Sequence, residues 1–173
     1  MQLINKDDVA WFITSHHITE AEEPNGIAQI HKAAMYGNLE VLNALILKGE
    51  DINRPDASQK TPLHYAALRG QLGATQALLE QGADPNAVDA YKSTPLHMAG
   101  ASRSNTGAVV AALITGGADP ELVNMHGGRA IETAVYNQNQ SAIQALLEAA
   151  DHAQRKRLLA VVDTAHNSRK RRI

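Results

Sequence analysis

Three histidines recur along this chain at one fixed interval, with 33 residues from His31 to His64 and 33 from His64 to His97. Imidazole is the commonest metal ligand in proteins, so a series of metal sites is one hypothesis. A regular array places successive rings about one repeat apart, which is too far for two rings to share one metal ion. The spacing therefore favours a structural role for these rings, and we predict no metal site.

A second cluster of possible metal ligands lies near the N-terminus. His16 and His17 precede three acidic residues, Glu20, Glu22 and Glu23. Adjacent residues on a helix do not face one another, so the two rings are poorly placed to bind one ion. We expect a polar helix end followed by a loop.

The segment 100–107 contains three hydroxyl side chains, those of Ser102, Ser104 and Thr106. It lacks the Gly-x-Ser-x-Gly pattern of a nucleophile elbow and the Gly-Lys-Ser/Thr pattern of a phosphate loop. A lengthened loop between two helices is the simpler interpretation, and contact with a partner is the alternative. No carboxylates are paired for acid and base catalysis, so we predict a non-enzymatic protein with no catalytic residue and no cofactor.

The elements around the three histidines are themselves repeated. Residues 61–67 are TPLHYAA, residues 94–99 are TPLHMA, and residues 30–34 are IHKAA. This opening, at a period of 33 residues, resembles the ankyrin-repeat family. The resemblance implies an all-α solenoid of stacked helix-turn-helix units with projecting β-turns. It also implies that each His ring hydrogen-bonds the backbone of neighbouring turns and ties the repeats together.

Residues 61–93 resemble the family most closely. In the family a Thr-Pro pair starts the first helix, Gly closes it, a Leu pair packs in the second helix, and Gly-Ala-Asp leads into the turn. Pro suits the first helical position because no hydrogen bond is lost there, and Gly ends a helix easily in the left-handed conformation. We expect Leu79, and Leu113 in the next repeat, to be buried between repeats. The matching residues here are Thr61, Pro62, Gly70, Leu78, Leu79, Gly82, Ala83 and Asp84.

The same comparison divides the chain, which we predict to be one domain over 1–173. Two residues are inserted near 102–105, Glu132 stands in place of His in the fourth repeat, and Gln59 and Lys92 replace turn glycines. We therefore expect distorted turns at Gln59 and Lys92. The predicted units are an N-terminal half-repeat cap at 6–27, repeats at 28–60, 61–93, 94–128 and 129–151, a C-terminal cap helix at 152–165 and a basic tail at 166–173.

Composition and charge limit the function. Aromatic residues are only 3% of the chain while hydrophobic residues are 44%, so Ala, Leu, Ile and Val must build the core. Residues 1–154 carry 9 Lys or Arg and 17 Asp or Glu, whereas residues 155–173 carry 7 and 1. An acidic body disfavours nucleic-acid binding by the repeats and favours a partner with a basic patch. We predict no membrane span, a cytoplasmic location and a monomer when free.

The resemblance implies binding of another protein, through the turn tips and the exposed face of the first helices. We predict that the chain occludes its partner, a toxin or an enzyme, as a bacterial immunity or inhibitor protein does. The alternative is an adaptor or secreted effector that acts on a host protein and uses the basic tail, with Arg169, Lys170, Arg171 and Arg172, for targeting. The predicted partner-binding residues are Tyr36, Ser58, Lys60, Arg69, Tyr91, Ser93, Arg103, Met125, His126 and Tyr136.

Overall fold

The computed structural model describes residues 26–170, except the side chains of residues 152–153 and 165–170. Most of the predicted cap at 6–27, with His16 and His17, lies outside the described residues. Within 26–170 the chain forms nine helices and no strand, which confirms the predicted all-α class. The helices are α2 (Gln29–Tyr36), α3 (Leu39–Lys48), α4 (Pro62–Arg69), α5 (Leu72–Glu80), α6 (Pro95–Ala101), α7 (Gly107–Thr115), α8 (Ala130–Tyr136), α9 (Gln140–Ala149) and α10 (His152–Lys170).

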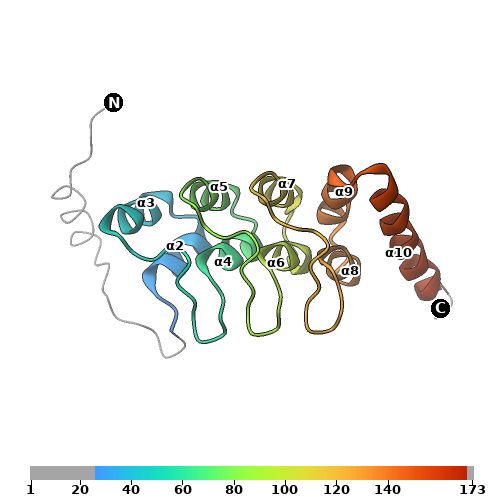
Figure 1. Ribbon diagram of the computed structural model, residues 1–173, viewed down its shortest axis with the longest axis horizontal. Coiled ribbons are helices and arrows are strands. Elements are labelled where there is room, and N and C mark those ends of the chain that lie inside the picture. The colour runs from blue at the N-terminus through green and yellow to red at the C-terminus, as the bar shows by residue number, and fades with distance from the viewer. Residues whose placement is uncertain (1–25, 171–173) are drawn as a thin grey trace.

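The first eight of these helices form two rows (Figure 1). The inner row holds α2, α4, α6 and α8 side by side, and the outer row holds α3, α5, α7 and α9. Loops lead from each of α3, α5 and α7 to the next inner helix, and all project on the side away from the outer row (Figure 1). The array is therefore a stack of helix pairs with projecting turns, as the repeat pattern predicts.

The inner helices begin and end where local sequence favours it. Pro62 stands at the first turn of α4, where a missing N–H costs no hydrogen bond. Gly70 ends the same helix in the left-handed region, with a φ of 69°. No side-chain hydrogen bond from Thr61 caps α4; instead the Thr61 N–H donates to Nδ1 of His64 at 3.1 Å, and the Thr61 Oγ1 lies 2.9 Å from the same nitrogen. The His ring is thus part of the helix cap.

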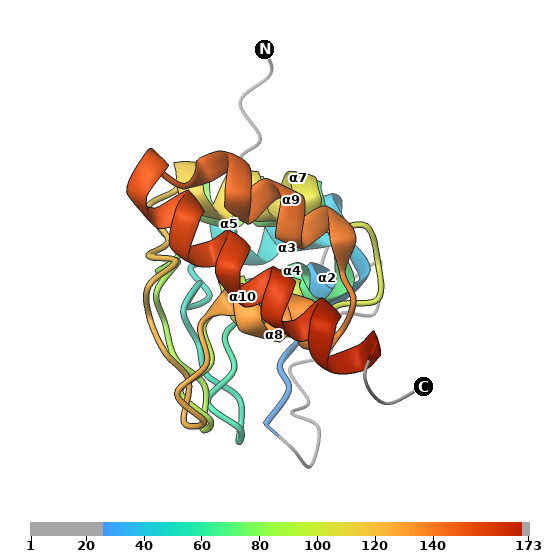
Figure 2. The same ribbon diagram turned by 90° about the vertical axis from the view of Figure 1, so that its right-hand side faces the viewer.

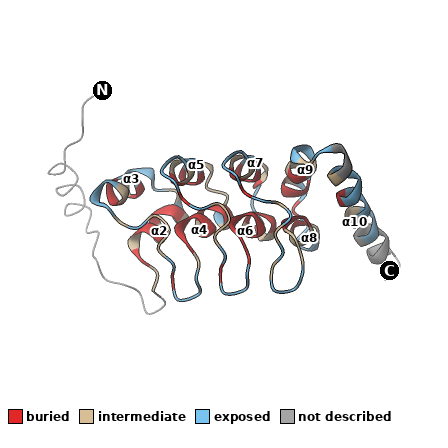
Figure 3. Cartoon of the chain, viewed as in Figure 1, coloured by how far each residue is buried: buried red, intermediate tan, exposed pale blue. Residues whose placement is uncertain are grey.

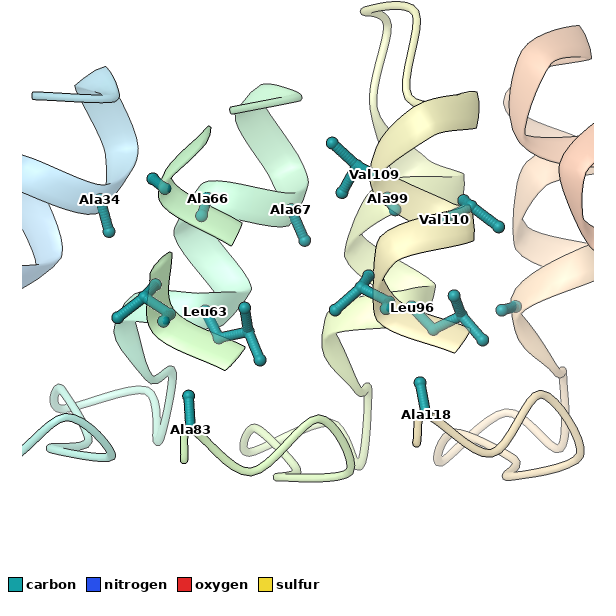
Figure 4. Close-up of a cluster of buried hydrophobic side chains, with 14 of the residues drawn as sticks. Ala34, Leu63, Ala66, Ala67, Ala83, Leu96, Ala99, Val109, Val110 and Ala118 are labelled. Carbon is teal, nitrogen blue, oxygen red and sulfur yellow. The ribbon is translucent and has the colours of Figure 1, made fainter. Parts of the chain in front are cut away.

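Buried residues line the two rows of helices where they face each other (Figure 3), and the core consists of small and branched aliphatic side chains (Figure 4). Leu63 and Leu96 of the inner row are completely buried, and so is Leu113 of the outer row, as expected. In α5, however, Leu78 takes the buried position and Leu79 is only partly buried. The expectation for Leu79 is corrected because consecutive helical residues point about 100° apart.

The helix α10 covers the C-terminal end of the stack, where it contacts α8 and α9 (Figure 2). Leu158 is its buried anchor. The helix continues to Lys170, past the predicted end at residue 165, because no Gly or Pro interrupts the segment. Part of the predicted tail at 166–173 is therefore helical. No helix within the described range is long and apolar enough to cross a membrane.

Candidate partner-binding surface

The three repeated histidines are buried and fully hydrogen-bonded. Their exposed fractions are 0–1%, and burial lowers the pKa of each ring below its ordinary value. Each Nδ1 accepts a backbone N–H three residues before it, so Nε2 carries the proton and donates to a carbonyl oxygen. This agrees with the structural role inferred from the resemblance. The pairs are His31 with Ala28 and Arg54, His64 with Thr61 and Ser93, and His97 with Thr94 and Gly128.

The projecting turns share one internal construction. In each of them a side-chain oxygen accepts two backbone N–H groups, two and four residues further along the chain. The oxygen belongs to Asp56, Asp89 or Asn124, and Asp56 and Asp89 are buried. Gln59 and Lys92 adopt φ values of 62° and 55°, close to the 73° of Gly127 in the next turn. The expectation of distorted turns is therefore wrong, because Gln59 and Lys92 adopt the same left-handed backbone conformation as the glycine.

Successive turn tips are also joined to one another. The backbone N–H of Ala90 donates to the carbonyl of Ser58 at 2.9 Å, and that of Met125 donates to the carbonyl of Tyr91 at 2.9 Å. These bonds link three turns that lie 33 or 35 residues apart in the sequence. The tips therefore form one continuous ribbon whose side chains are held in a fixed order.

Apolar side chains project from this ribbon. Val88, Tyr91, Val123 and Met125 are between 52% and 56% exposed, and we call these four residues the turn-tip surface. Tyr91 and Met125 were predicted from the sequence, but Val88 and Val123 were missed. The available signal was their position directly before Asp89 and Asn124, the residues around which each turn folds. An exposed apolar group on a rigid ribbon is typical of a surface that binds another protein.

Lys60 belongs to the interior of the turns more than to their surface. Its Nζ lies 3.4 Å from the buried Oδ2 of Asp89 and 5.9 Å from the centre of the Tyr91 ring. That carboxylate oxygen accepts no hydrogen bond within the described residues, so the Lys60 cation compensates its charge. In the preceding turn the Tyr65 hydroxyl donates to Asp56 at 2.6 Å instead. Burial opposes charge on Asp56, yet this and other hydrogen bonds hold its pKa below the ordinary value.

The other predicted residues lie in several places. Ser58 and His126 are exposed at the turn tips, whereas Ser93 is 7% exposed and its carbonyl is bonded to His64. Ser93 is therefore unsuited to contact a partner. The rest lie at the C-terminal ends of the inner helices or, for Arg103, just after one, about 12 Å from the turns for an eight-residue helix. This helix-end row consists of Tyr36, Arg69, Arg103 and Tyr136, all exposed.

The loop with the three hydroxyl residues is held in place from a neighbouring repeat. Ser102 and Thr106 are almost completely buried, and the Thr106 hydroxyl donates to the carbonyl of Ala99 at 2.8 Å. The Asn139 amide donates to the Ala99 and Ser102 carbonyls and to Thr106 Oγ1. Ser102 and Thr106 thus stabilise the junction, whereas Arg103, Ser104 and Asn105 of this loop are exposed to solvent.

Comparison with known proteins gives one positive result. A family model described as ankyrin repeats (3 copies) matches residues 2–89, just over half of the chain. A search of the curated proteins found no match.

Proposed function

The chain belongs to the ankyrin-repeat family, and from this premise we propose that it binds one partner protein through the turn-tip surface and the helix-end row, and thereby occludes it. The family is one of protein–protein interaction modules. The observation that carries the proposal is the ribbon of turn tips joined by the Ser58–Ala90 and Tyr91–Met125 hydrogen bonds. Such a ribbon loses little conformational entropy when its exposed aromatic and aliphatic side chains meet a partner.

The charge distribution supports a partner with a basic patch. The acidic body raises the rate of encounter with such a partner more than it raises the affinity, and the effect weakens with salt. Arg69 and Arg103 at the helix-end row supply anchors of a type that is enriched in interface hot spots. A small chain that covers a toxin or an enzyme in this way acts as an inhibitor or a bacterial immunity protein. The proposal includes a cytoplasmic location and a monomeric free state, which cell fractionation and sedimentation would test.

A second candidate is an adaptor or effector that acts on a host protein. It is favoured by the continuation of α10 to Lys170 and by the exposure of Arg155, Lys156 and Arg157 on that helix. In that case the basic C-terminus provides targeting, and its removal changes the location of the protein without changing its affinity for the partner.

The experiment begins with a pull-down from the native source and identification of the partner by mass spectrometry. The double variant Tyr91→Ala/Met125→Ala should then lose at least tenfold in affinity, about 1.4 kcal/mol. The variant Arg69→Ala/Arg103→Ala tests the helix-end row separately. Asn43→Ala, on the outer face of α3, is the matched control and should bind like the wild type. A loss below tenfold in both double variants, with the fold intact by melting, would exclude this surface.

A further inference from the structure

The outer face of α7 differs from the faces of its two neighbours. Exposed polar side chains occupy the outer faces of α5 and α9, with Gln76 and Glu80 on the first helix and Gln144 and Glu148 on the second. The equivalent positions of α7 are Ala111 and Thr115, and the nine residues of this helix, GAVVAALIT, include no charge. Ala108, Ala111 and Thr115 are nevertheless exposed. A helix that is apolar all round is normally covered on every side, but the described part of this chain leaves this face open.

Two grooves flank this open face. The groove between α5 and α7 has a volume of about 610 Å³, with Leu72 and Leu79 in its wall. The groove between α7 and α9 has a volume of about 710 Å³, with Ile114 and Ala145 in its lining. Ala108, Ala111 and Thr115 line both grooves, so the two form one trough that runs over α7.

The trough is bounded by two wall helices. Packed helices are about 8–10 Å apart, which puts the axes of α5 and α9 about 16–20 Å apart on either side of α7. Each wall helix with its side chains extends about 5–6 Å from its axis, so a partner helix about 10–12 Å across does not sink between the walls but lies on α7 and contacts side chains of both walls. The small residues of α7 would let the backbone of that helix approach closely.

The charges of the walls indicate which kind of helix fits. Neither α5, α7 nor α9 contains Lys or Arg, while Glu80 and Glu148 stand on opposite walls. The Gln144 amide donates to Glu148 at 2.9 Å, which holds that carboxylate on its wall. A second copy of this chain would present the same three helices, which supply no cation to pair with these carboxylates. The walls therefore fit a partner with cations along its flanks.

We propose that the trough over α7 binds an amphipathic helix of another protein, with an apolar stripe on Ala108 and Ala111 and with Lys or Arg facing Glu80 and Glu148. The outer row lies away from the projecting turns (Figure 1), so this surface is separate from the turn-tip surface and stands independently of it. Both surfaces can then be occupied at once, and the chain can join two proteins.

The test uses two labelled synthetic peptides of about 18 residues, or five helical turns. Both have an Ala/Leu stripe, flanked by Lys in one peptide and by Glu in the other. Titration of the full chain, followed by fluorescence anisotropy, should show at least tenfold tighter binding of the Lys-flanked peptide. Ala111→Arg should weaken that binding at least tenfold by filling the trough. Asn43→Arg, which adds the same charge at the equivalent position of α3, should leave it unchanged.

Charge reversal provides the sharper comparison. The double variant Glu80→Lys/Glu148→Lys should prefer the Glu-flanked peptide, while Tyr91→Ala/Met125→Ala should bind both peptides as the wild type does. The proposal is overturned if neither peptide binds the wild type up to about 1 mM, where binding is worth only about 4 kcal/mol. Equal binding of both peptides, or binding unaffected by Ala111→Arg, would overturn it as well.

Discussion

The helices α4 and α8 occupy equivalent places in the inner row, but their third residues make different contacts. In α4 the neutral His64 ring accepts the Thr61 N–H and donates to the Ser93 carbonyl in the following turn. In α8 Glu132 accepts the Arg129 N–H at 2.9 Å and pairs with the Arg129 guanidinium at 2.6 Å. The chain after α9 forms α10 instead of another projecting turn, so Glu132 has no following turn to reach.

The difference shows that the repeated histidine stabilises the contact between one repeat and the next, and not only the helix on which it lies. His64 satisfies two backbone groups in the interior, and loss of a buried partner costs about 1–3 kcal/mol for each group. The Arg129–Glu132 pair is partly exposed, and such pairs contribute about 0–1 kcal/mol. Burial disfavours charge on Glu132, but the hydrogen bonds from Arg129 hold its pKa below the ordinary value. We therefore expect the middle of the array to be more stable than its C-terminal end.

The largest effect should follow loss of a buried leucine in the middle. Leu63→Ala should cost roughly 2–5 kcal/mol in the free energy of unfolding, measured by urea melts. Leu63 lies in α4, which packs against both α2 and α6. For comparison, Leu158 is also buried but lies in the terminal helix α10. Stability in such arrays is a sum of local and nearest-neighbour contributions. Leu158→Ala should therefore speed hydrogen exchange in 140–164 and leave 61–93 protected, and equal acceleration in both segments would contradict the comparison.

The next largest effect should follow removal of the side chain at each of the two compared positions. His64→Ala leaves the Thr61 N–H and the Ser93 carbonyl without partners and should destabilise the chain by about 2–4 kcal/mol. Glu132→Ala should cost no more than about 1 kcal/mol, and 1 M salt should reduce that cost further. If urea melts show similar decreases in the free energy of unfolding for the two variants, the hydrogen bond from His64 to the Ser93 carbonyl adds no stability beyond that of a local helix cap.

The sequence predicted the parts of this comparison that depend on local chemistry. Pro62 and Gly70 mark the ends of α4 because backbone rules act within a few residues. The burial of Leu78 instead of Leu79 depends on the rotation of α5 against its neighbours, which the Leu-Leu pair itself does not specify. The contacts of Asn139 with Ser102 and Thr106 were missed, because only the packed array brings residues so distant in sequence together. The exposure of Val88 likewise results from the three-dimensional ribbon of turns.

Acid should weaken the middle of the array at a pH where the Arg129–Glu132 pair is still intact. Burial lowers the pKa of His31, His64 and His97 in the folded chain below the value of 6.5 expected when unfolded. The unfolded chain therefore binds more protons as the pH falls below about 6.5, so the stability present above that pH is progressively lost. The pKa of Glu132 lies below 4.5 in the folded chain, so its contribution is lost only at lower pH.

Urea melts at pH 7, 6 and 5 would test this. The free energy of unfolding should decrease over this range in the wild type and to the same extent in Glu132→Gln. The decrease should be smaller in His64→Ala, which lacks one of the three titrating rings. A pH-independent stability between 7 and 5 would show that the buried rings are protonated without cost.

The smallest expected effects concern strained backbone, which is present in both regions. Lys92 in a middle turn and Gln138 after α8 have φ values of 55° and 61°, in the left-handed region that glycine adopts without strain. Lys92→Gly should stabilise the chain by about 0.5–1 kcal/mol, and Gly127→Ala, at the equivalent turn position, should destabilise it by a similar amount. If Gln138→Gly raises the free energy of unfolding no more than Lys92→Gly does, the two regions are about equally strained. The weakness of the C-terminal end then results from the absence of a histidine at position 132. If Gln138→Gly instead raises the free energy of unfolding several times more than Lys92→Gly does, backbone strain at Gln138 causes the weakness of the C-terminal end. The difference between His64 and Glu132 would then not be its cause.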